Sequence, residues 1–373
     1  MKHRQLILIL VSLVPIALFC FAATADASQC SLVSPQVGYV CDARPAQHTF
    51  LAPEPRPDSI LPSFTFSWIE DHAPLYAEPN LNAPLLGNAG TGFIYQTIAD
   101  AANDAEGNRW YKVLGGWTPA GNVNIVAGTD FTGMEIHARP ERPFGWMLDV
   151  WVLRDEPDGP LPPEESRVFL QRYDFIQIYG AARGVDGWLW YDIGGGRWVK
   201  ENYLSIIDYA ARPEGIGPGE YWVAVDLTEQ VFAAYEGDRM VYAGLVSSGL
   251  DRWPTREGVF TVWDRHLYAP MSGGEVGDDF YNLEHVPHPM YFDDGISLHG
   301  AYWHNGFGRQ KSHGCVNMPP KDAEWVFFWS GSAPGDLRVW VYSNEVDHIL
   351  KKFEQGAVTS GSTAPLAANV FAH

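Results

Sequence analysis

The stretch SHGCVN, residues 312–317, lies in the last third of the chain, and the interpretation of the whole sequence depends on it. It contains one cysteine, Cys315, directly after a Ser-His-Gly run. The chain has four cysteines in all: Cys20 lies in an apolar N-terminal run, and Cys30 and Cys41 follow closely behind it. If Cys30 pairs with Cys41, Cys315 is left as an unpaired thiol in an exported chain. Such a thiol is exposed to oxidation, so its presence calls for a functional or structural explanation. It is either a nucleophile or a buried, inert cysteine, and the count alone leaves both open.

The N-terminus has the three parts of a secretory signal in the usual order. A basic start, MKHRQ, precedes an apolar run over residues 6–23 and two overlapping Ala-x-Ala sites. We therefore predict that residues 1–27 are a signal peptide and that the protein is exported and associated with the cell envelope. The apolar run is close to the length that spans a bilayer, so an uncleaved N-terminal anchor is the alternative. Residues 28–63 are predicted to be a Pro-rich linker that contains a Cys30–Cys41 disulfide.

The composition favours short strands and argues against a nucleic-acid partner. Aromatic residues make up 14% of the chain, which also has 37 glycines, a mixture typical of strands and turns. The formal net charge is −20, whereas a phosphate backbone requires a basic surface. We expect a fold that is mainly β throughout.

An internal repeat occupies the middle of the sequence, over residues 64–127 and 146–208. Trp110 and Trp190 correspond, as do the tyrosines that follow them, with an offset of about 80 residues. The order of short strands, turns and W-Y-x-V runs resembles bacterial SH3-like domains. This resemblance implies two small β-barrels that bind cell-wall material or act as spacers. For most of the aromatic residues we favour another explanation, which is that they fill two small cores.

Residues 219–344 have a different pattern, with three consecutive strands expected after residue 220 and further strands near residues 258, 296 and 337. The run PKDAEWVFFWS from Pro320 is the best helix candidate, with a proline near its start and acidic residues in the first turn. Residues 266–290 are predicted to form a mobile hairpin lid. The tail, 345–373, is predicted to be flexible apart from one short helical possibility.

Cysteine attacks as a thiolate, so it needs a base and a stabilised oxyanion nearby. His299 lies 16 residues upstream of Cys315 at the end of an apolar run, and a strand, loop and return could bring the two side chains together. His313 supplies a second imidazole, and Gly314 leaves the backbone open to a substrate carbonyl. Each of these features is weak evidence by itself.

Together, these residues resemble the catalytic domain of the L,D-transpeptidases, the YkuD-like family. The family signature is a His-Gly pair, a spacer, and Ser-His-Gly-Cys followed by an aliphatic residue and Asn or Arg. Here it is His299-Gly300 and residues 312–317. The resemblance implies a β-sandwich with one or two short helices after the two barrels. Two departures are visible: Arg256 stands where the family often has proline, and His288 stands where an aromatic residue is common.

The resemblance also implies roles for individual residues. Cys315 would be the nucleophile, His299 the general base oriented by the carbonyl of Gly300, and His313 a supporting group. The expected oxyanion and substrate-binding residues, beside the amide of Cys315 itself, are Gly314, Ser312, Asn317, Tyr291 and Trp303. For Trp303, core packing is the alternative.

The implied reaction is acyl transfer between peptidoglycan stem peptides, in which D-Ala leaves a donor tetrapeptide and an acceptor amine forms a 3→3 cross-link. The resemblance also implies acylation of Cys315 by carbapenems. Two alternatives remain: an L,D-carboxypeptidase that uses water, and a catalytically silent wall-binding protein. No cofactor is expected. A zinc site is disfavoured because Cys315 would be its only thiol and no His-Glu-x-x-His helix is present; its candidate ligands would be His285, His288, His299, His304 and His313.

Overall fold

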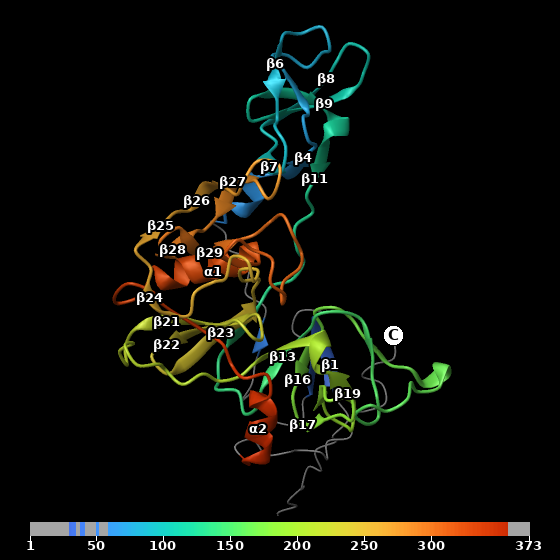
Figure 1. Cartoon of the computed structure of the whole chain (residues 1–373), viewed down its shortest axis with the longest axis vertical. Coiled ribbons are helices and arrows are strands. Elements are labelled where there is room, and N and C mark those ends of the chain that lie inside the picture. The colour runs from blue at the N-terminus through green and yellow to red at the C-terminus, as the bar shows by residue number, and fades with distance from the viewer. Residues whose placement is uncertain (1–29, 35–37, 42–49, 52–58, 357–373) are drawn as a thin grey trace, which may run out of the picture.

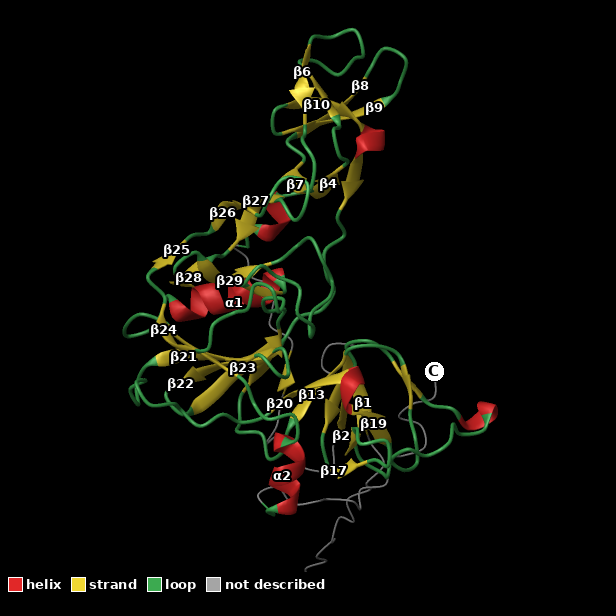
Figure 2. Cartoon of the chain, viewed as in Figure 1, coloured by secondary structure: helices red, strands yellow, loops and turns green. Residues whose placement is uncertain are grey.

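The computed structural model describes residues 30–34, 38–41, 50–51 and 59–356, and these form three parts (Figure 1). The first β-unit (residues 64–127) lies at one end of the long axis, the C-terminal part (219–344) lies in the middle, and the second β-unit (146–208) lies beside the C-terminal part. The predicted mainly β fold is confirmed, with strands in every part (Figure 2). Among the helices of the described residues, none is both long and apolar enough to span a bilayer.

Most predictions about the N-terminus fall outside the described residues, including the signal peptide or anchor. The backbone strands β1 (Cys30–Ser34) and β2 (Gly38–Cys41) pair antiparallel, with Cys30 opposite Cys41. The disulfide between these two residues stays a prediction. A short strand, β3 (Phe50–Leu51), follows.

The first β-unit consists of two small sheets around its own apolar core. One sheet has the order β6-β5-β10-β9-β8, and the other begins β11-β4-β7. Ile69, Leu75 and Ile94 are among the buried residues between them. The strands are β4 (Phe66–Ile69), β5 (Pro74–Tyr76), β6 (Leu85–Asn88), β7 (Phe93–Thr97), β8 (Asp100–Asn103), β9 (Arg109–Val113), β10 (Gly116–Pro119) and β11 (Val123–Ile125).

The second β-unit repeats this strand order. Its sheet β16-β13-β20 corresponds to β7-β4-β11, and β15-β14 joins β19-β18-β17 through an Arg154–Trp198 bridge. In both units a single 3₁₀ turn precedes the last strand, at Ala120–Asn122 and Glu201–Tyr203. The internal repeat is therefore also a repeat of topology, whereas the likeness to SH3-like domains stays a prediction. The strands are β13 (Phe144–Met147), β14 (Trp151–Val152), β15 (Phe169–Leu170), β16 (Phe175–Gln177), β17 (Gly180–Arg183), β18 (Leu189–Asp192), β19 (Trp198–Lys200) and β20 (Leu204–Ile207).

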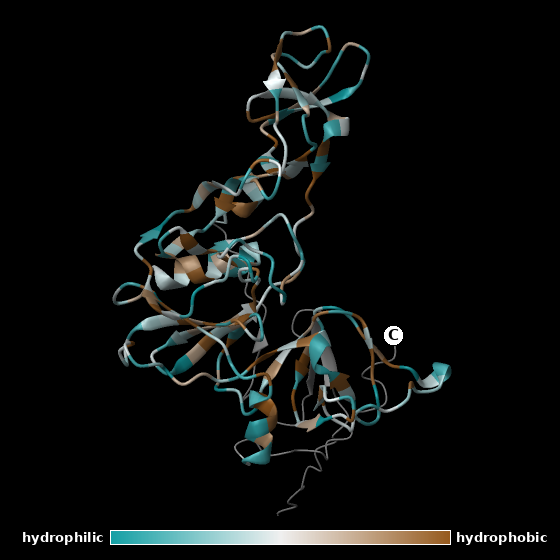
Figure 3. Ribbon diagram, viewed as in Figure 1, coloured by the Kyte–Doolittle hydropathy of each residue, from teal (hydrophilic) through white to brown (hydrophobic). Residues whose placement is uncertain are grey.

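The C-terminal part is a sandwich of a seven-stranded sheet and a four-stranded sheet, with α1 (Pro320–Ser330) packed into the same core. Hydrophobic segments gather around α1 and the strands against it (Figure 3). The large sheet has the order β24-β31-β21-β22-β23-β12-β3, and the small one β25-β28-β29-β30. The strands are β12 (Met134–Ile136), β21 (Tyr221–Asp226), β22 (Val231–Glu236), β23 (Arg239–Leu245), β24 (Gly258–Thr261), β25 (Asp264–Arg265), β28 (Met290–Asp293), β29 (Ile296–Gly300), β30 (Val316–Met318) and β31 (Arg338–Tyr342).

The seven-stranded sheet is covered on both faces. Val223 and Val225 of β21 face the small sheet and α1, whereas Trp222 and Ala224 face a second core. The segment between the β-units and the second β-unit complete that core with Phe131, Trp146 and Ile207, among other residues. Because both faces are buried, β21–β23 have almost no exposed positions, which explains why the alternation of polar and apolar residues in the sequence is only partial.

At the start of the tail, 345–373, the one short helical possibility is confirmed as a helix. Helix α2 (His348–Glu354) follows β31, and Ile349 is fully buried in the core of the second β-unit. The remainder of the tail, from residue 357, lies outside the described residues. The segment between the β-units was not predicted to have structure, yet β12 pairs with β23 at the edge of the large sheet.

Asp322, at the start of α1, fastens the segment between the β-units to the sandwich. Its buried carboxylate accepts hydrogen bonds from Thr132 Oγ1 at 2.7 Å, from the Gly133 amide at 2.8 Å and from Tyr242 Oη at 2.9 Å. Replacing Asp322 with alanine leaves two hydroxyls and one amide without an acceptor, and each such group costs about 1–3 kcal/mol. We expect the free energy of unfolding in urea to fall by about 3 kcal/mol. The exposed Asp336→Ala change should leave it unaltered, and equal midpoints for the two variants would contradict this role.

Candidate active site

Strands β29 and β30 bring the predicted nucleophile and base onto one edge of the small sheet. They pair in parallel, with Leu298 opposite Val316 and His299 opposite Asn317. Extended by one residue, this register places Ser297 beside Cys315, and their Oγ and Sγ atoms are 3.9 Å apart. Side chains two residues apart on a strand share a face, so Ser297 and His299 both lie on the side of the sheet that carries Cys315.

Cys315 is a free, half-buried thiol directly before β30. Burial raises the pKa of Cys315, and hydrogen bonds from the backbone amide and hydroxyl of Ser297 act in the opposite direction. A second polar atom, the carbonyl oxygen of Gly295, lies 3.8 Å from Sγ. The resting side chain is therefore a thiol, and its ionisation depends on Ser297 and on a base that accepts its proton.

His299 is held in one orientation by the backbone. Its Nδ1 lies 3.2 Å from the carbonyl oxygen of Gly300, the contact that the family resemblance implied. Because a carbonyl can only accept, the proton of the neutral ring lies on Nδ1 and Nε2 is left as the basic atom. Burial lowers the pKa of His299 to about 4. The ring of Trp303 packs beside the imidazole with centroids 5.6 Å apart.

Gly300 has to be a glycine because the chain is crowded there. A Cβ at this position would lie 2.9 Å from Pro287 Cγ and 3.0 Å from Pro320 Cα. Contacts this short would displace the backbone whose carbonyl orients His299.

The loop SHGC is braced by its own serine and by a threonine from outside. Ser312 Oγ donates to the carbonyl of Cys315 and accepts from the Gly314 amide at 3.1 Å, while Thr255 Oγ1 donates to the Gly314 carbonyl at 2.7 Å. The Gly314 amide, predicted to stabilise an oxyanion, is thus engaged within the loop. Gly314 has a φ of +110°, which disfavours any side chain at this position. Ser312 acts on the loop backbone and not on Sγ.

His313 faces the hairpin formed by β26 (Tyr268–Gly273) and β27 (Tyr281–Pro287), and not the thiol. Its ring stacks on Trp253 with centroids 3.9 Å apart, and its Nε2 lies 3.3 Å from Asp279 Oδ2. Burial lowers the pKa of His313, and the neighbouring Asp279 opposes that effect. Arg252 lies on the other side of Asp279, with a nitrogen 3.8 Å from its carboxylate. Asp279 of the hairpin thus contacts both His313 of the catalytic loop (residues 312–315) and Arg252.

The remaining predicted residues take different places. Asn317 is buried, and its side-chain amide nitrogen lies 2.9 Å from His304 Nε2. Asn317 therefore holds the loop that contains His304. Tyr291 is half-buried, and its pKa is raised by burial and by the neighbouring Cys315, which places it beside the thiol. His288, the departure from the family pattern, is fully buried against Phe327 of α1, 5.1 Å away, and is not part of the site.

Comparison with known proteins gives the family of this region. Residues 220–341 match the model of the YkuD family, the L,D-transpeptidase catalytic domain. The chain carries an L,D-transpeptidase catalytic domain. This transpeptidase domain covers the whole sandwich apart from β3 and β12, which come from outside it.

Two relatives show how much of the chain is shared. YciB of Bacillus subtilis strain 168, whose name assigns it to the L,D-transpeptidases, is 28% identical over 148 residues, which are 35% of this chain and 73% of that protein. The solved catalytic domain of the Enterococcus faecium L,D-transpeptidase is 27% identical over 33% of this chain and 98% of that one, with a TM-score of 0.29. Against a longer E. faecium chain, a mutant crystal structure with a TM-score of 0.30 and 26% identity, the match covers 33% of this chain and only 50% of that one.

Sequence reasoning missed Ser297, Tyr281 and Asp279 as parts of the site. Ser297 lies two residues before His299 on a strand, so alternation could have placed it on the catalytic face. Burial and the nearby Cys315 raise the pKa of Tyr281. Nothing in the sequence indicated which hairpin residues face the catalytic loop, because the turn between β26 (Tyr268–Gly273) and β27 (Tyr281–Pro287) sets their register.

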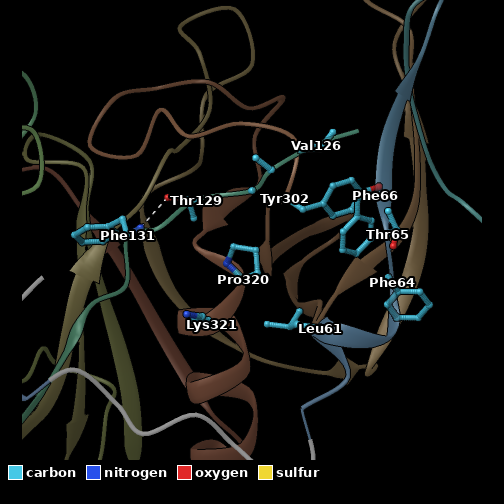
Figure 4. A pocket seen from close by; sticks show the side chains of 12 residues that line it. Leu61, Phe64, Thr65, Phe66, Val126, Thr129, Phe131, Tyr302, Pro320 and Lys321 are labelled. Atoms are coloured by element: carbon cyan, nitrogen blue, oxygen red, sulfur yellow. Dashed lines mark hydrogen bonds between the residues drawn. The ribbon is translucent and has the colours of Figure 1, made fainter. Parts of the chain in front are cut away.

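The histidines proposed as zinc ligands do not converge. Within the described ranges, no three His, Cys, Asp or Glu side chains are grouped as a metal ion would require. A pocket of about 290 Å³ lies away from the thiol, where the first β-unit meets the start of α1 (Figure 4). Another pocket, of about 280 Å³, lies between the second β-unit and the transpeptidase domain, and Glu229 and Arg309 are among its lining residues. Cys315 lines neither of these pockets.

Ser297→Ala should make the thiol harder to ionise. The change removes the hydroxyl 3.9 Å from Sγ but keeps the backbone amide and the buried volume nearly unchanged. We expect the pH midpoint of Cys315 alkylation by iodoacetamide to rise and alkylation at pH 7 to slow about tenfold, since one pKa unit corresponds to a tenfold change in thiolate. Ser272→Ala, at an exposed position of β26, is the matched control. Identical alkylation profiles for the two variants would remove Ser297 from the mechanism.

Proposed function

We propose that the protein is a peptidoglycan L,D-transpeptidase that forms 3→3 cross-links through a Cys315 thioester. The observation that carries this proposal is the β29–β30 pair, which sets a free thiol beside Ser297 on the face that also holds a neutral, backbone-oriented His299. A neutral imidazole with an open Nε2 can accept the thiol proton as Sγ attacks a carbonyl carbon.

In the first half-reaction, Sγ attacks the carbonyl that joins the diamino acid of the donor stem to its terminal D-Ala. The thiol proton passes to His299 Nε2, and the oxyanion is stabilised by the amide of Cys315. When the tetrahedral intermediate collapses, the C–N bond breaks and the proton moves from Nε2 to the D-Ala nitrogen. The products are a thioester and free D-Ala.

In the second half-reaction, the side-chain amine of an acceptor stem attacks the thioester carbonyl. His299 Nε2 takes a proton from the attacking amine, the C–S bond breaks, and the proton returns to Sγ. The product is a new amide between two stems. Tyr281 and Tyr291, whose pKa values are raised by burial and by the nearby Cys315, are the residues we assign to contact the bound stems.

The signal-like N-terminus supports the same function, because the substrate lies outside the cytoplasmic membrane. We propose an exported, envelope-associated enzyme whose partners are the donor tetrapeptide and the acceptor amine. Contact with the membrane would occur only if the apolar run over residues 6–23 is retained as an anchor.

The test is incubation with purified disaccharide-tetrapeptide, followed by mass spectrometry of the products. Transpeptidation gives a cross-linked dimer and one D-Ala per bond formed. Tripeptide and D-Ala without dimer would establish an L,D-carboxypeptidase. If neither product forms and a carbapenem adds no mass, the chemistry is absent, and binding to insoluble peptidoglycan becomes the function to measure.

The rate of acylation by a carbapenem should be insensitive to mild acid. Attack needs neutral His299, and its pKa of about 4 means that this form persists well below pH 6. We expect a constant rate between about pH 5 and pH 7 and a fall as the pH drops through about 4. Tryptophan fluorescence at each pH checks that the protein stays folded. A midpoint near the ordinary histidine value of about 6.5 would show that His299 is solvated or is not the base.

A further inference from the structure

The hairpin β26–β27 belongs to a sheet of the first β-unit. Strand β27 runs parallel to β7, with Tyr281 opposite Phe93 and Leu283 opposite Tyr95, which gives the sheet order β11-β4-β7-β27-β26. Figure 1 shows these strands side by side at the junction of the two parts. In the second β-unit the corresponding strand, β16, lies at the edge of its sheet. The two repeats therefore differ at this strand: the sheet of the first β-unit continues into the hairpin, and the sheet of the second does not.

Phe280 anchors the hairpin in the first β-unit. Its ring packs against the core formed by Ile94 and its neighbours, and its carbonyl accepts a hydrogen bond from the Phe93 amide at 2.9 Å. Gly92, with a φ of +119°, allows this close approach, because a Cβ there would overlap the Phe280 carbonyl oxygen. The contact between these two parts thus depends on Gly92 of the first β-unit and on Phe280 of the transpeptidase domain.

Further contacts continue along the same junction. Glu284 of β27 accepts hydrogen bonds from the amide of Thr97 at 2.8 Å and from its hydroxyl at 3.0 Å. The rings of Phe66 and Tyr302 are stacked, with centroids 3.7 Å apart, and Figure 4 shows them side by side. The junction is therefore built from backbone pairing, a charged hydrogen bond and aromatic packing together.

The neighbours of Phe280 face the catalytic loop. Asp279 lies 3.3 Å from His313, and the Tyr281 ring lies 5.0 Å from the His313 ring. Phe280 is flanked by Asp279, the last residue of the turn, and by Tyr281, the first residue of β27, so holding Phe280 in the first β-unit fixes both neighbours next to His313. The position of these two side chains over the catalytic loop thus follows from how the first β-unit holds the hairpin.

We propose that the first β-unit is a positioning element of the transpeptidase domain: it holds the hairpin β26–β27 against the catalytic loop and so shapes the groove that receives the peptide stem. Phe280 and Gly92 are positioning residues in this arrangement. The inference rests on the proposed function. Because Ser297, His299 and Cys315 belong to β29 and the loop before β30, releasing the hairpin should weaken ligand binding more than it slows the chemical step.

Gly92→Ala tests the proposal, with Gly90→Ala as its matched control. Both glycines have positive φ values, +119° and +87°, so both variants strain the backbone of the same turn, but the space around Gly90 is open. Acylation of the full chain by a carbapenem gives the concentration for half-maximal rate and the rate at saturation. We expect Gly92→Ala to raise the first about tenfold and to change the second less than threefold, with Gly90→Ala close to the parent.

Hydrogen exchange measured on the same proteins separates positioning from general destabilisation. Faster exchange in Gly92→Ala should be confined to residues 268–287 and 93–97, with β21–β23 protected as in the parent. Thr97→Val removes the hydroxyl that contacts Glu284 and His285 of β27 and keeps the side-chain shape. It should show a smaller change of the same kind even if Gly92→Ala does not fold.

Each outcome decides one question. If the parent is acylated and Gly92→Ala and Thr97→Val behave like Gly90→Ala in both measurements, the positioning role is wrong while the proposed function stands. If the parent is not acylated, the proposed function fails, and the exchange data alone decide whether the first β-unit holds the hairpin. Faster exchange throughout the domain in both variants would also overturn the proposal.

Discussion

Cys315→Ala is expected to abolish the covalent adduct between the protein and a carbapenem, and with it all product from disaccharide-tetrapeptide. Cys315 is the free cysteine of the described residues and is half-buried beside Ser297. No other side chain on that face can form a thioester. The variant should remain folded, because removing one half-buried sulfur costs only about 1 kcal/mol.

Intact-mass spectrometry of the parent and the variant measures this directly. The parent should gain one ligand mass per chain and Cys315→Ala none, with thermal midpoints that differ by no more than about 4 °C. Cys315→Ser separates nucleophilicity from shape, because the hydroxyl fills a similar volume and should react far more slowly. An adduct that persists in Cys315→Ala would place the nucleophile elsewhere.

His299→Ala is expected to slow acylation by about 10²- to 10⁴-fold, the usual contribution of a positioned general base. Without the imidazole, the thiol has no acceptor for its proton, and burial keeps the pKa of Cys315 above its ordinary value. The residual rate should then rise with pH as hydroxide ionises the thiol, whereas the parent shows no such dependence between pH 5 and pH 7.

His137→Ala, at an exposed histidine of the segment between the β-units, is the matched control and should keep the parent rate. The measurement is the acylation rate as a function of pH for the parent and both variants. A loss of less than tenfold in His299→Ala would mean that another group accepts the proton, and the lowered pKa of His299 would then reflect burial alone.

The sequence was sufficient to predict the family of the C-terminal part and most of its strands and its helix. His299 and the SHGC run carry the signature themselves, and the predicted helix from Pro320 begins and ends where α1 does. These features are local: a motif keeps its spacing, and a helix shows its capping and acidic first turn within a few residues.

What the sequence did not reveal depends on contacts between distant residues. Nothing near Gly92 indicates that it allows the approach of Phe280, and nothing near Ile349 indicates that it fills the core of the second β-unit. Strand β12 was missed because three residues at the edge of a sheet have no periodicity of their own. The prediction of two repeat units followed by a catalytic domain therefore did not include the contacts that join these parts.

The junction between β7 and β27 also constrains the order in which the chain can fold. Thr97 and Glu284 are 187 positions apart, and the second β-unit needs Ile349 from beyond the last strand of the sandwich. During synthesis, neither N-terminal unit can bury its apolar surface fully until nearly all of the chain has emerged. Such long-range pairing makes folding slow and concentrates it in one late, cooperative step.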